Sequence, residues 1–236
     1  MTDPTTPTDT VTLHVWRVRP RNVPAALMTS RVTARRLRRR RDVTFVKVLG
    51  TATDAFVPTA FTLQRWVAVI CRRGSTDSVN WMDPVKEPWW ERHAVEQASL
   101  TLRPLSSRGR WDGQEPFVVR RSEDGAWSGP VVALTRSTVR LRAARRFYRA
   151  VPPVADELRG MSGCRIAFGI GEAPVLRQGT ISVWSSAEAM KAFAYRSPRH
   201  AAAVAATPEQ NWYAEELFTR FALLDATGTI DGMAVA

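Results

Sequence analysis

The sequence contains few of the residues that disulfide-linked or metal-binding proteins use. Among its 236 residues there are two cysteines, Cys71 and Cys164, and three histidines, His14, His93 and His200. Two cysteines 93 positions apart provide neither a disulfide framework nor a zinc-binding pattern. The acidic residues are scattered without the spacing of metal ligands. Metal or nucleophilic chemistry must therefore use one of very few imidazoles.

Long apolar stretches are also missing. The longest uninterrupted runs, 66–71 and 201–206, are far shorter than the roughly 20 residues that cross a membrane. The first ten residues are polar and have neither the apolar core nor the cleavage site of a signal peptide. We therefore expect a cytoplasmic protein.

Common nucleotide-binding and hydrolase motifs are absent. The sequence Gly-Ile-Gly-Glu at 169–172 is too short for a dinucleotide fingerprint and lacks its third glycine. There is no Walker lysine and no Gly-x-Ser-x-Gly motif. The sequence therefore disfavours nucleotide-binding proteins and hydrolases.

Lysine is rare although the net charge is +12, because 31 of the 34 basic residues are arginine. Such a bias is typical of a GC-rich genome. Seven of the arginines fall between Arg31 and Arg41. We interpret this run as a solvated helix face. The alternative is a polyanion-binding module, in which the run contacts an anionic membrane surface, an acidic partner or, least favoured, nucleic acid.

The composition, 44% hydrophobic and 24% charged, is that of a globular protein. Hydrophobic periodicity predicts the order β-α-β-β-α-β twice along the chain. In the first half the predicted strands are 11–18, 43–49, 65–72 and 100–105, and the helices are 23–41 and 89–100. In the second half the strands are 131–141, 165–170, 180–184 and 217–224, with a helix over 142–159 and capping boxes at 185–188 and 207–210.

The fold class predicted from this repeat is α+β, with two tandem ferredoxin-like halves packed as an intramolecular α+β barrel. The tripeptide Arg-His-Ala recurs at 92–94 and 199–201, once in each repeat. The expected organisation is a disordered tail (1–10), an N-terminal half (11–105), a Gly/Ser-rich linker (106–130), a C-terminal half (131–228) and a second tail (229–236).

His200 is the most informative candidate for chemistry. Ser197 can cap a helix that begins at Pro198, which places His200 in the first turn, where the helix dipole disfavours an imidazolium. A neutral imidazole can bind a metal, and the small residues 201–206 leave room for a flat group. The alternative is an ordinary exposed or hydrogen-bonded helix histidine, and His93 has the corresponding alternative of a partly buried structural role.

The C-terminal half carries motifs that together resemble the spheroidene monooxygenase family, whose bacterial enzymes introduce a keto oxygen into acyclic carotenoids. These motifs are AFGIGEAP at 167–174, Gln178, SVW at 182–184, the segment 190–200 and WYAEELFTRF at 212–221. The likeness continues upstream at 108–111, 116–117 and 129–136, and it covers roughly residues 10–228.

The resemblance implies a haem-dependent oxygenase with a dimeric α+β-barrel fold, which dye-decolourising peroxidases, chlorite dismutases and aldoxime dehydratases share. It implies haem b between the C-terminal sheet and a helix that supplies a proximal histidine, and the matching position is His200, with His93 as the fallback. The expected partners are dioxygen, an apolar or natural-product substrate and an electron donor such as ferredoxin. A homo-oligomer and peripheral membrane contact stay open.

Further site residues follow from the same resemblance. The haem would contact Phe193 and Trp184, and its propionates would pair with Arg196 and Arg199. On the open side of the haem, the expected residues are Gln178 or Arg165, donating a hydrogen bond to an iron-bound ligand, and Glu172, orienting a pocket residue. Because nine tryptophans also suit an ordinary core, a cofactor-free α+β-barrel monooxygenase or a binder of polyene or polyaromatic ligands remains the alternative.

Overall fold

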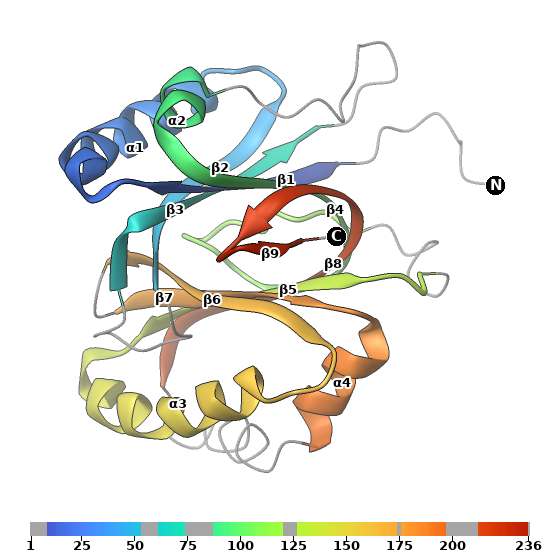
Figure 1. The fold of residues 1–236 in the computed structure, drawn as a ribbon. Helices are drawn as coiled ribbons and strands as arrows, with labels where there is room; N and C mark the ends of the chain where they lie inside the picture. The colour runs from blue at the N-terminus through green and yellow to red at the C-terminus, as the bar shows by residue number, and fades with distance from the viewer. Residues whose placement is uncertain are drawn as a thin grey trace.

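The computed structural model describes residues 9–52, 61–73, 87–119, 127–173, 176–196 and 212–235. It consists of two layers of helices on either side of a β-barrel (Figure 1). The first half contains β1 (Thr10–Val18), η1 (Pro20–Asn22), α1 (Val23–Arg38), β2 (Val43–Ala52), β3 (Phe61–Arg72), α2 (Pro88–His93) and β4 (Ala94–Gly109). The second contains β5 (Val131–Val139), η4 (Leu141–Ala143), α3 (Ala144–Arg159), β6 (Cys164–Ala173), β7 (Arg177–Trp184), α4 (Ala187–Arg196), β8 (Tyr213–Ile230) and β9 (Met233–Ala234).

The sheet topology repeats between the halves. The first half has the strand order β4-β1-β3-β2, and the second has the matching order β8-β5-β7-β6. Two antiparallel seams join the halves, a short one between β2 and β6 and a long one between β4 and β8. The predicted fold class, two ferredoxin-like halves that form an α+β barrel, is confirmed.

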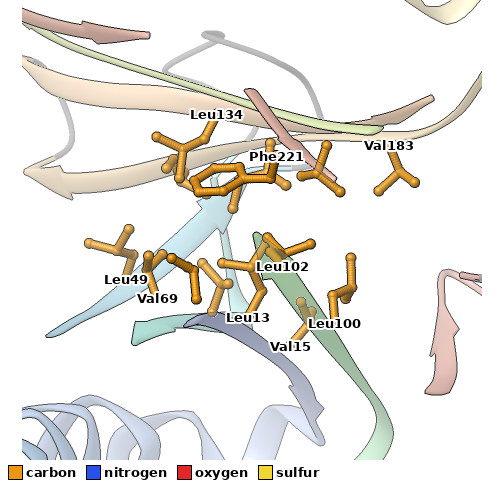
Figure 2. Close-up of a cluster of buried hydrophobic side chains, with 14 of the residues drawn as sticks. Leu13, Val15, Leu49, Val69, Leu100, Leu102, Leu134, Val183 and Phe221 are labelled. Atoms are coloured by element: carbon orange, nitrogen blue, oxygen red, sulfur yellow. The ribbon is translucent and has the colours of Figure 1, made fainter. Parts of the chain in front are cut away.

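The barrel interior is filled by apolar side chains, so it is a core and not a channel. Because side chains alternate across a strand, every second residue of each strand points inward. Leu13, Val69, Leu102, Leu134 and Phe221 meet there, each less than 2% exposed (Figure 2). Apolar burial of this kind stabilises a fold by about 25 cal/mol per Å².

The helices cover the outer faces of the two half-sheets, on opposite sides of the barrel (Figure 1). Helices α1 and α2 pack on Trp16 and Trp66 of the first half-sheet, and Trp90 of α2 belongs to the same cluster. Helices α3 and α4 pack on the second half, and the predicted cap of α4 is confirmed by Ser186, whose Oγ accepts a hydrogen bond of 3.2 Å from Ala189 N–H. Among the described helices, none has the length and apolar character needed to cross a bilayer.

The structure corrects one predicted helix. The helix expected over 89–100 ends at His93, and residues 94–100 begin the long strand β4. The local sequence around Glu96, Gln97 and Ala98 favours a helix, but β1 and β8 pair with both edges of β4 and complete its hydrogen bonds. Tertiary pairing thus overrides a weak local preference.

Other boundaries differ because strands extend when a partner is present. Strand β4 continues to Gly109, inside the region expected as a linker, and β8 is longer than predicted at both ends. At the C-terminus β8 turns into β9, and Val235, expected in a tail, is fully buried. The division of the chain at 106–130 stays a prediction. Residues 1–8 and the capping box at 207–210 lie outside the described residues.

Candidate functional site

The face of the C-terminal sheet that α3 and α4 cover changes from apolar to polar along the strands. Residues paired across neighbouring strands share a face, so the register of β7, β5 and β8 gives successive rows. In the order β7–β5–β8 these rows are Trp184–Val131–Ala222, Ser182–Ala133–Arg220, Thr180–Thr135–Phe218 and Gln178–Ser137–Glu216. We call this the α3/α4 layer. On its β6 side it carries only small residues, Ala167, Gly169 and Gly171.

The apolar end of the α3/α4 layer is aromatic. Trp184 is 1% exposed, and its ring lies 5.6 Å from the ring of Phe193 on α4. Its indole Nε1 donates a hydrogen bond of 2.9 Å to Ser182 Oγ, which satisfies the polar edge of the ring. Met190 packs in the same cluster. Trp184 and Phe193, both predicted from the resemblance as cofactor contacts, therefore lie together.

The polar end contains buried atoms that lack partners. At this end Ser137 Oγ and Gln178 Nε2 are buried without a hydrogen-bond partner in the described part of the chain, and so is Arg220 Nε, which lies in the row next to Trp184. The Gln178 side chain is hydrogen-bonded to the Tyr148 hydroxyl of α3, and burial raises the pKa of that hydroxyl. Leaving a buried polar atom unsatisfied costs about 1–3 kcal/mol. Several such atoms on one face are the expected feature of a surface that receives a polar ligand.

The predicted haem ligand lies outside the described residues, on the segment 197–211, as does Arg199. The described residues on either side of that segment lie beside the α3/α4 layer. Its first neighbour is Arg196, the last residue of α4, whose side chain is also outside the described part. Its other neighbour, Trp212, is buried 5.8 Å from the ring of Phe147 on α3.

Two other predicted residues do not face the layer. Arg165 is exposed, at the irregular start of β6. Glu172 follows Gly171, which pairs with Gln178, so the alternation of a strand points Glu172 to the opposite face, into the barrel. Of the three residues expected around the iron-bound ligand, only Gln178 lies on the α3/α4 layer.

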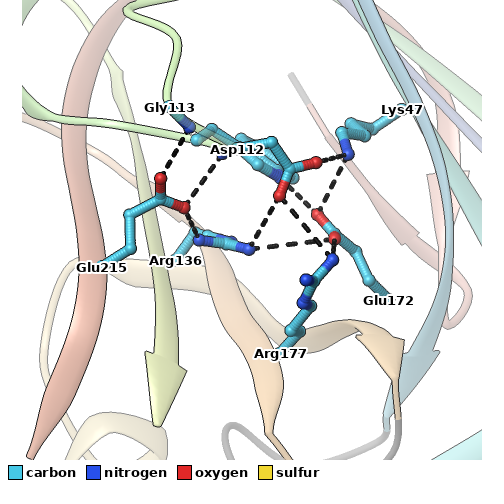
Figure 3. Close-up of polar contacts among 8 residues, drawn as sticks. Lys47, Asp112, Gly113, Arg136, Glu172, Arg177 and Glu215 are labelled. Carbon is cyan, nitrogen blue, oxygen red and sulfur yellow. Dashed lines mark hydrogen bonds and ion pairs between the residues drawn. The ribbon is translucent and has the colours of Figure 1, made fainter. Parts of the chain in front are cut away.

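Glu172 belongs instead to a cluster of charges at one end of the barrel (Figure 3). Arg136, 2% exposed, pairs with Glu215 and lies 3.4 Å from Asp112 and 3.8 Å from Glu172. The cluster has three cations and three anions: Lys47, Arg136, Arg177, Asp112, Glu172 and Glu215. Burial would raise the pKa of Asp112, but the hydrogen bond and charge of Lys47, with the two arginines, hold it below its usual range. The balance of charges indicates a structural role for this barrel-end cluster, which closes one end of the barrel.

The two cysteines and His93 also belong to residue types that can carry chemistry, but their surroundings indicate structural roles. Both cysteines are free, and burial raises the pKa of each thiol to about 11, so neither is a ready nucleophile. His93 Nδ1 is 2.8 Å from the Trp89 carbonyl, and the two rings stack. Within the described ranges no group of three or more His, Cys, Asp or Glu side chains could hold a metal ion.

His14 makes a testable contribution to stability. It is buried beside Trp16, its Nε2 has no partner among the described residues, and burial lowers its pKa from 6.5 to about 4. The unfolded chain therefore binds a proton at a pH where the folded protein does not, and stability is lost as the pH falls from 6.5 to about 4.

We expect the loss at the acid end to reach about 3 kcal/mol. Replacing His14 with phenylalanine should flatten the pH dependence of the free energy of unfolding over this window, as measured by urea titration. An unchanged slope in His14→Phe would show that other groups control acid stability.

Sequence reasoning did not find Ser137, Tyr148 or Arg220. For Ser137 and Arg220 the only local signal is a polar residue at alternate positions of β5 and β8, which is also the pattern of a solvent-facing strand, and Tyr148 lies on a helix. The helices that cover this face distinguish the two cases, and only the tertiary structure shows which face of the sheet they cover.

No protein-family model matches the sequence. Three curated proteins do, all named spheroidene monooxygenase. The protein from Rubrivivax gelatinosus is 41% identical over 143 residues, 61% of this chain and 54% of its own. The protein from Rhodobacter capsulatus is 37% identical over 140 residues, 59% and 58% respectively, and that from Cereibacter sphaeroides is 35% identical over 145 residues, 61% and 44%. The chain thus spans about half the length of the relatives it matches.

A solved structure supports the fold. An aldoxime dehydratase in complex with butyraldoxime superimposes with a TM-score of 0.59 over 94% of this chain and 81% of its own, at 11% identity. At that identity the likeness concerns the fold alone. The sequence comparisons go further, because they confirm the resemblance that the C-terminal motifs indicated: over about three fifths of its length, this chain is similar to the spheroidene monooxygenases.

Proposed function

We propose that this protein is a haem-dependent monooxygenase that oxidises an apolar substrate, with haem b held in the α3/α4 layer and His200 as the iron ligand. The observation that carries the proposal is the layer itself, which α3 and α4 cover in part, with a buried aromatic pair at one end and buried polar atoms that lack partners among the described residues farther along the strands. The relationship to spheroidene monooxygenases supports the oxygenase activity and a polyene-like substrate.

The residues of the layer fit such a group. Haem b combines a flat apolar macrocycle with two carboxylates, so it needs an aromatic wall, a floor of small residues and hydrogen-bond donors. Trp184 and Phe193 supply the wall, and the small outward residues of β6 supply the floor. Arg220 Nε is an unused donor for a carboxylate. Arg196, the residue before the segment that carries His200, is the last residue of α4, which covers the same layer.

When bound, haem would supply the activation of dioxygen. The protein's own residues would position the reactants. Gln178 Nε2 holds an unused N–H on the layer, where it would donate to dioxygen or to an oxygen of the substrate. Tyr148, bonded to the same side chain, acts as a positioning residue that fixes its orientation. Monooxygenation also needs two electrons, so a donor such as ferredoxin is part of the proposal.

The proposal is tested by the absorption spectrum of protein purified from haem-supplemented cells and titrated with haem. We expect a Soret band that saturates at one haem per chain. Gln178→Leu should keep this band, alter the spectrum of the carbon monoxide adduct and lower turnover of an acyclic carotenoid roughly 10- to 100-fold.

The matched control is Gln114→Leu, an exposed glutamine in the turn after β4, which should behave as wild type. A protein that shows no Soret band after titration would rule out the haem proposal and favour the cofactor-free α+β-barrel alternative. A Gln178→Leu variant with wild-type turnover and spectrum would remove Gln178 from the site.

A further inference from the structure

We propose that the outer face of α1 docks the protein on an anionic lipid surface. This face exposes three apolar side chains on a helix that has a complete buried face elsewhere. Leu27 is 43% exposed, Met28 66% and Val32 61%. The side that packs on the sheet is formed by Ala26, Ser30, Thr33 and Leu37. The exposed apolar residues therefore contribute nothing to the core.

Arginines surround these apolar side chains. With 3.6 residues per turn, Arg31, Arg35, Arg38 and Arg39 fall in the same half of the helix circumference as Leu27, Met28 and Val32. All four are exposed and make no ion pair within the described residues. Their neighbours are paired, Arg36 with Glu87 and Arg40 with Asp42. Residues 23–41 contain no acidic side chain, so the face carries a single sign of charge.

The combination of charges and apolar groups identifies the partner. A helix face that only contacts water does not require exposed apolar side chains such as Leu27, Met28 and Val32. Binding to nucleic acid would involve the arginines and leave these apolar side chains without a partner. A helix lying in a membrane interface needs both, apolar side chains that enter the acyl boundary and arginines that meet anionic headgroups. Charge complementarity therefore favours an anionic bilayer.

A cavity at the start of α1 provides a matching headgroup site. It has a volume of about 220 Å³ and is lined by Arg19, Arg21, Asn22, Arg92 and His93, among others. Asn22 is the residue from which α1 begins, so the cavity is continuous with the docking helix. Three arginines among the lining residues suit a phosphate group. Docking here leaves the α3/α4 layer uncovered, because α3 lies on the other side of the barrel (Figure 1).

The test is co-sedimentation of the full chain with vesicles of phosphatidylcholine mixed with phosphatidylglycerol, and with vesicles of phosphatidylcholine alone. We expect binding to the anionic vesicles only. Changing Arg31, Arg35, Arg38 and Arg39 together to glutamine should weaken it by at least about tenfold. Changing Leu27, Met28 and Val32 together to serine should weaken it by a similar factor and leave a residual binding that added salt abolishes.

The chain offers a control with the same loss of charge. Arg142, Arg145, Arg146 and Arg149 are exposed on and beside α3, on the opposite side of the barrel. Changing these four to glutamine should alter vesicle binding less than about twofold, with circular dichroism confirming the fold of every variant.

Three results would overturn the proposal. Equal losses in the two arginine variants would mean attraction by net charge, without a docking face. A serine variant that binds as wild type would exclude apolar insertion. Tighter binding to duplex nucleic acid than to the anionic vesicles, lost in the α1 arginine variant, would assign the face to nucleic acid. Because binding to vesicles needs no haem, the outcome is separate from that of the proposed oxygenase function.

Discussion

The variant His200→Ala is expected to lose the Soret band and the oxygenase activity of the haem-loaded protein. A single imidazole nitrogen would hold the iron from the protein side, so its removal should weaken haem binding by more than about 100-fold, beyond what the loss of a supporting residue costs. The measurement is haem titration of wild type and variant, followed by absorption, with turnover of an acyclic carotenoid as the second readout. Free imidazole should restore part of the band.

His93→Ala is the matched control, because Arg-His-Ala occurs in both halves. The His93 ring is stacked on Trp89, 4.6 Å away, with Nδ1 held by a backbone carbonyl, and it lies in the half opposite to the α3/α4 layer. We expect this variant to keep the full Soret band. Loss of the band only in His93→Ala would move the haem site to the first half, and a band retained in both variants would assign the ligand to another residue.

The largest effect on stability is expected for Arg136→Met. The Arg136 side chain is 2% exposed, and it faces Glu215, Asp112 and Glu172 in the barrel-end cluster. Removing it leaves carboxylates close together with too little positive charge, and such a loss from a buried network costs about 3–5 kcal/mol. Urea unfolding followed by tryptophan fluorescence measures this change.

A comparison of two arginines in the barrel-end cluster separates the effect of burial on stability from the effect of charge. Arg177 contacts the same two carboxylates, Asp112 and Glu172, but is 50% exposed, so Arg177→Met should cost no more than about 1 kcal/mol. Adding Glu215→Gln to Arg136→Met should recover part of the loss, because it removes one of the uncompensated charges. If Arg136→Met and Arg177→Met were equally destabilising, burial of Arg136 would not be the cause.

The repeat of two βαββαβ halves could be predicted because it depends on local patterns. Alternation of side chains marked β2 and a continuous apolar run marked β3, and turn and capping residues separated the strands from the helices. The recurrence of Arg-His-Ala aligned the halves. The expected cap at the start of α4 formed because a serine hydroxyl reaches a backbone N–H only three residues away.

Strand length could not be predicted in the same way. Residues 94–100 have a sequence compatible with a helix, and they are a strand because β1 pairs with them on one side and β8 pairs with residues 98–100 on the other. The burial of Val235 has the same origin, because the barrel that buries it is formed by strands distant in the sequence. Local propensities are worth a fraction of a kcal/mol per residue, and pairing overrides them.

For the candidate site, the sequence showed which residues are candidates, but it did not show the direction in which each side chain points. The motifs singled out Gln178, Glu172, Trp184 and Phe193, but the register of β6 against β7 decides that Gln178 faces the helices while Glu172 enters the barrel. Tyr148 joins Gln178 from a different element. The sequence by itself determined the repeat, the family resemblance and the candidate histidine. Only the tertiary structure decided which face each strand residue occupies, because a shift of one position along a strand reverses the side to which its side chain points.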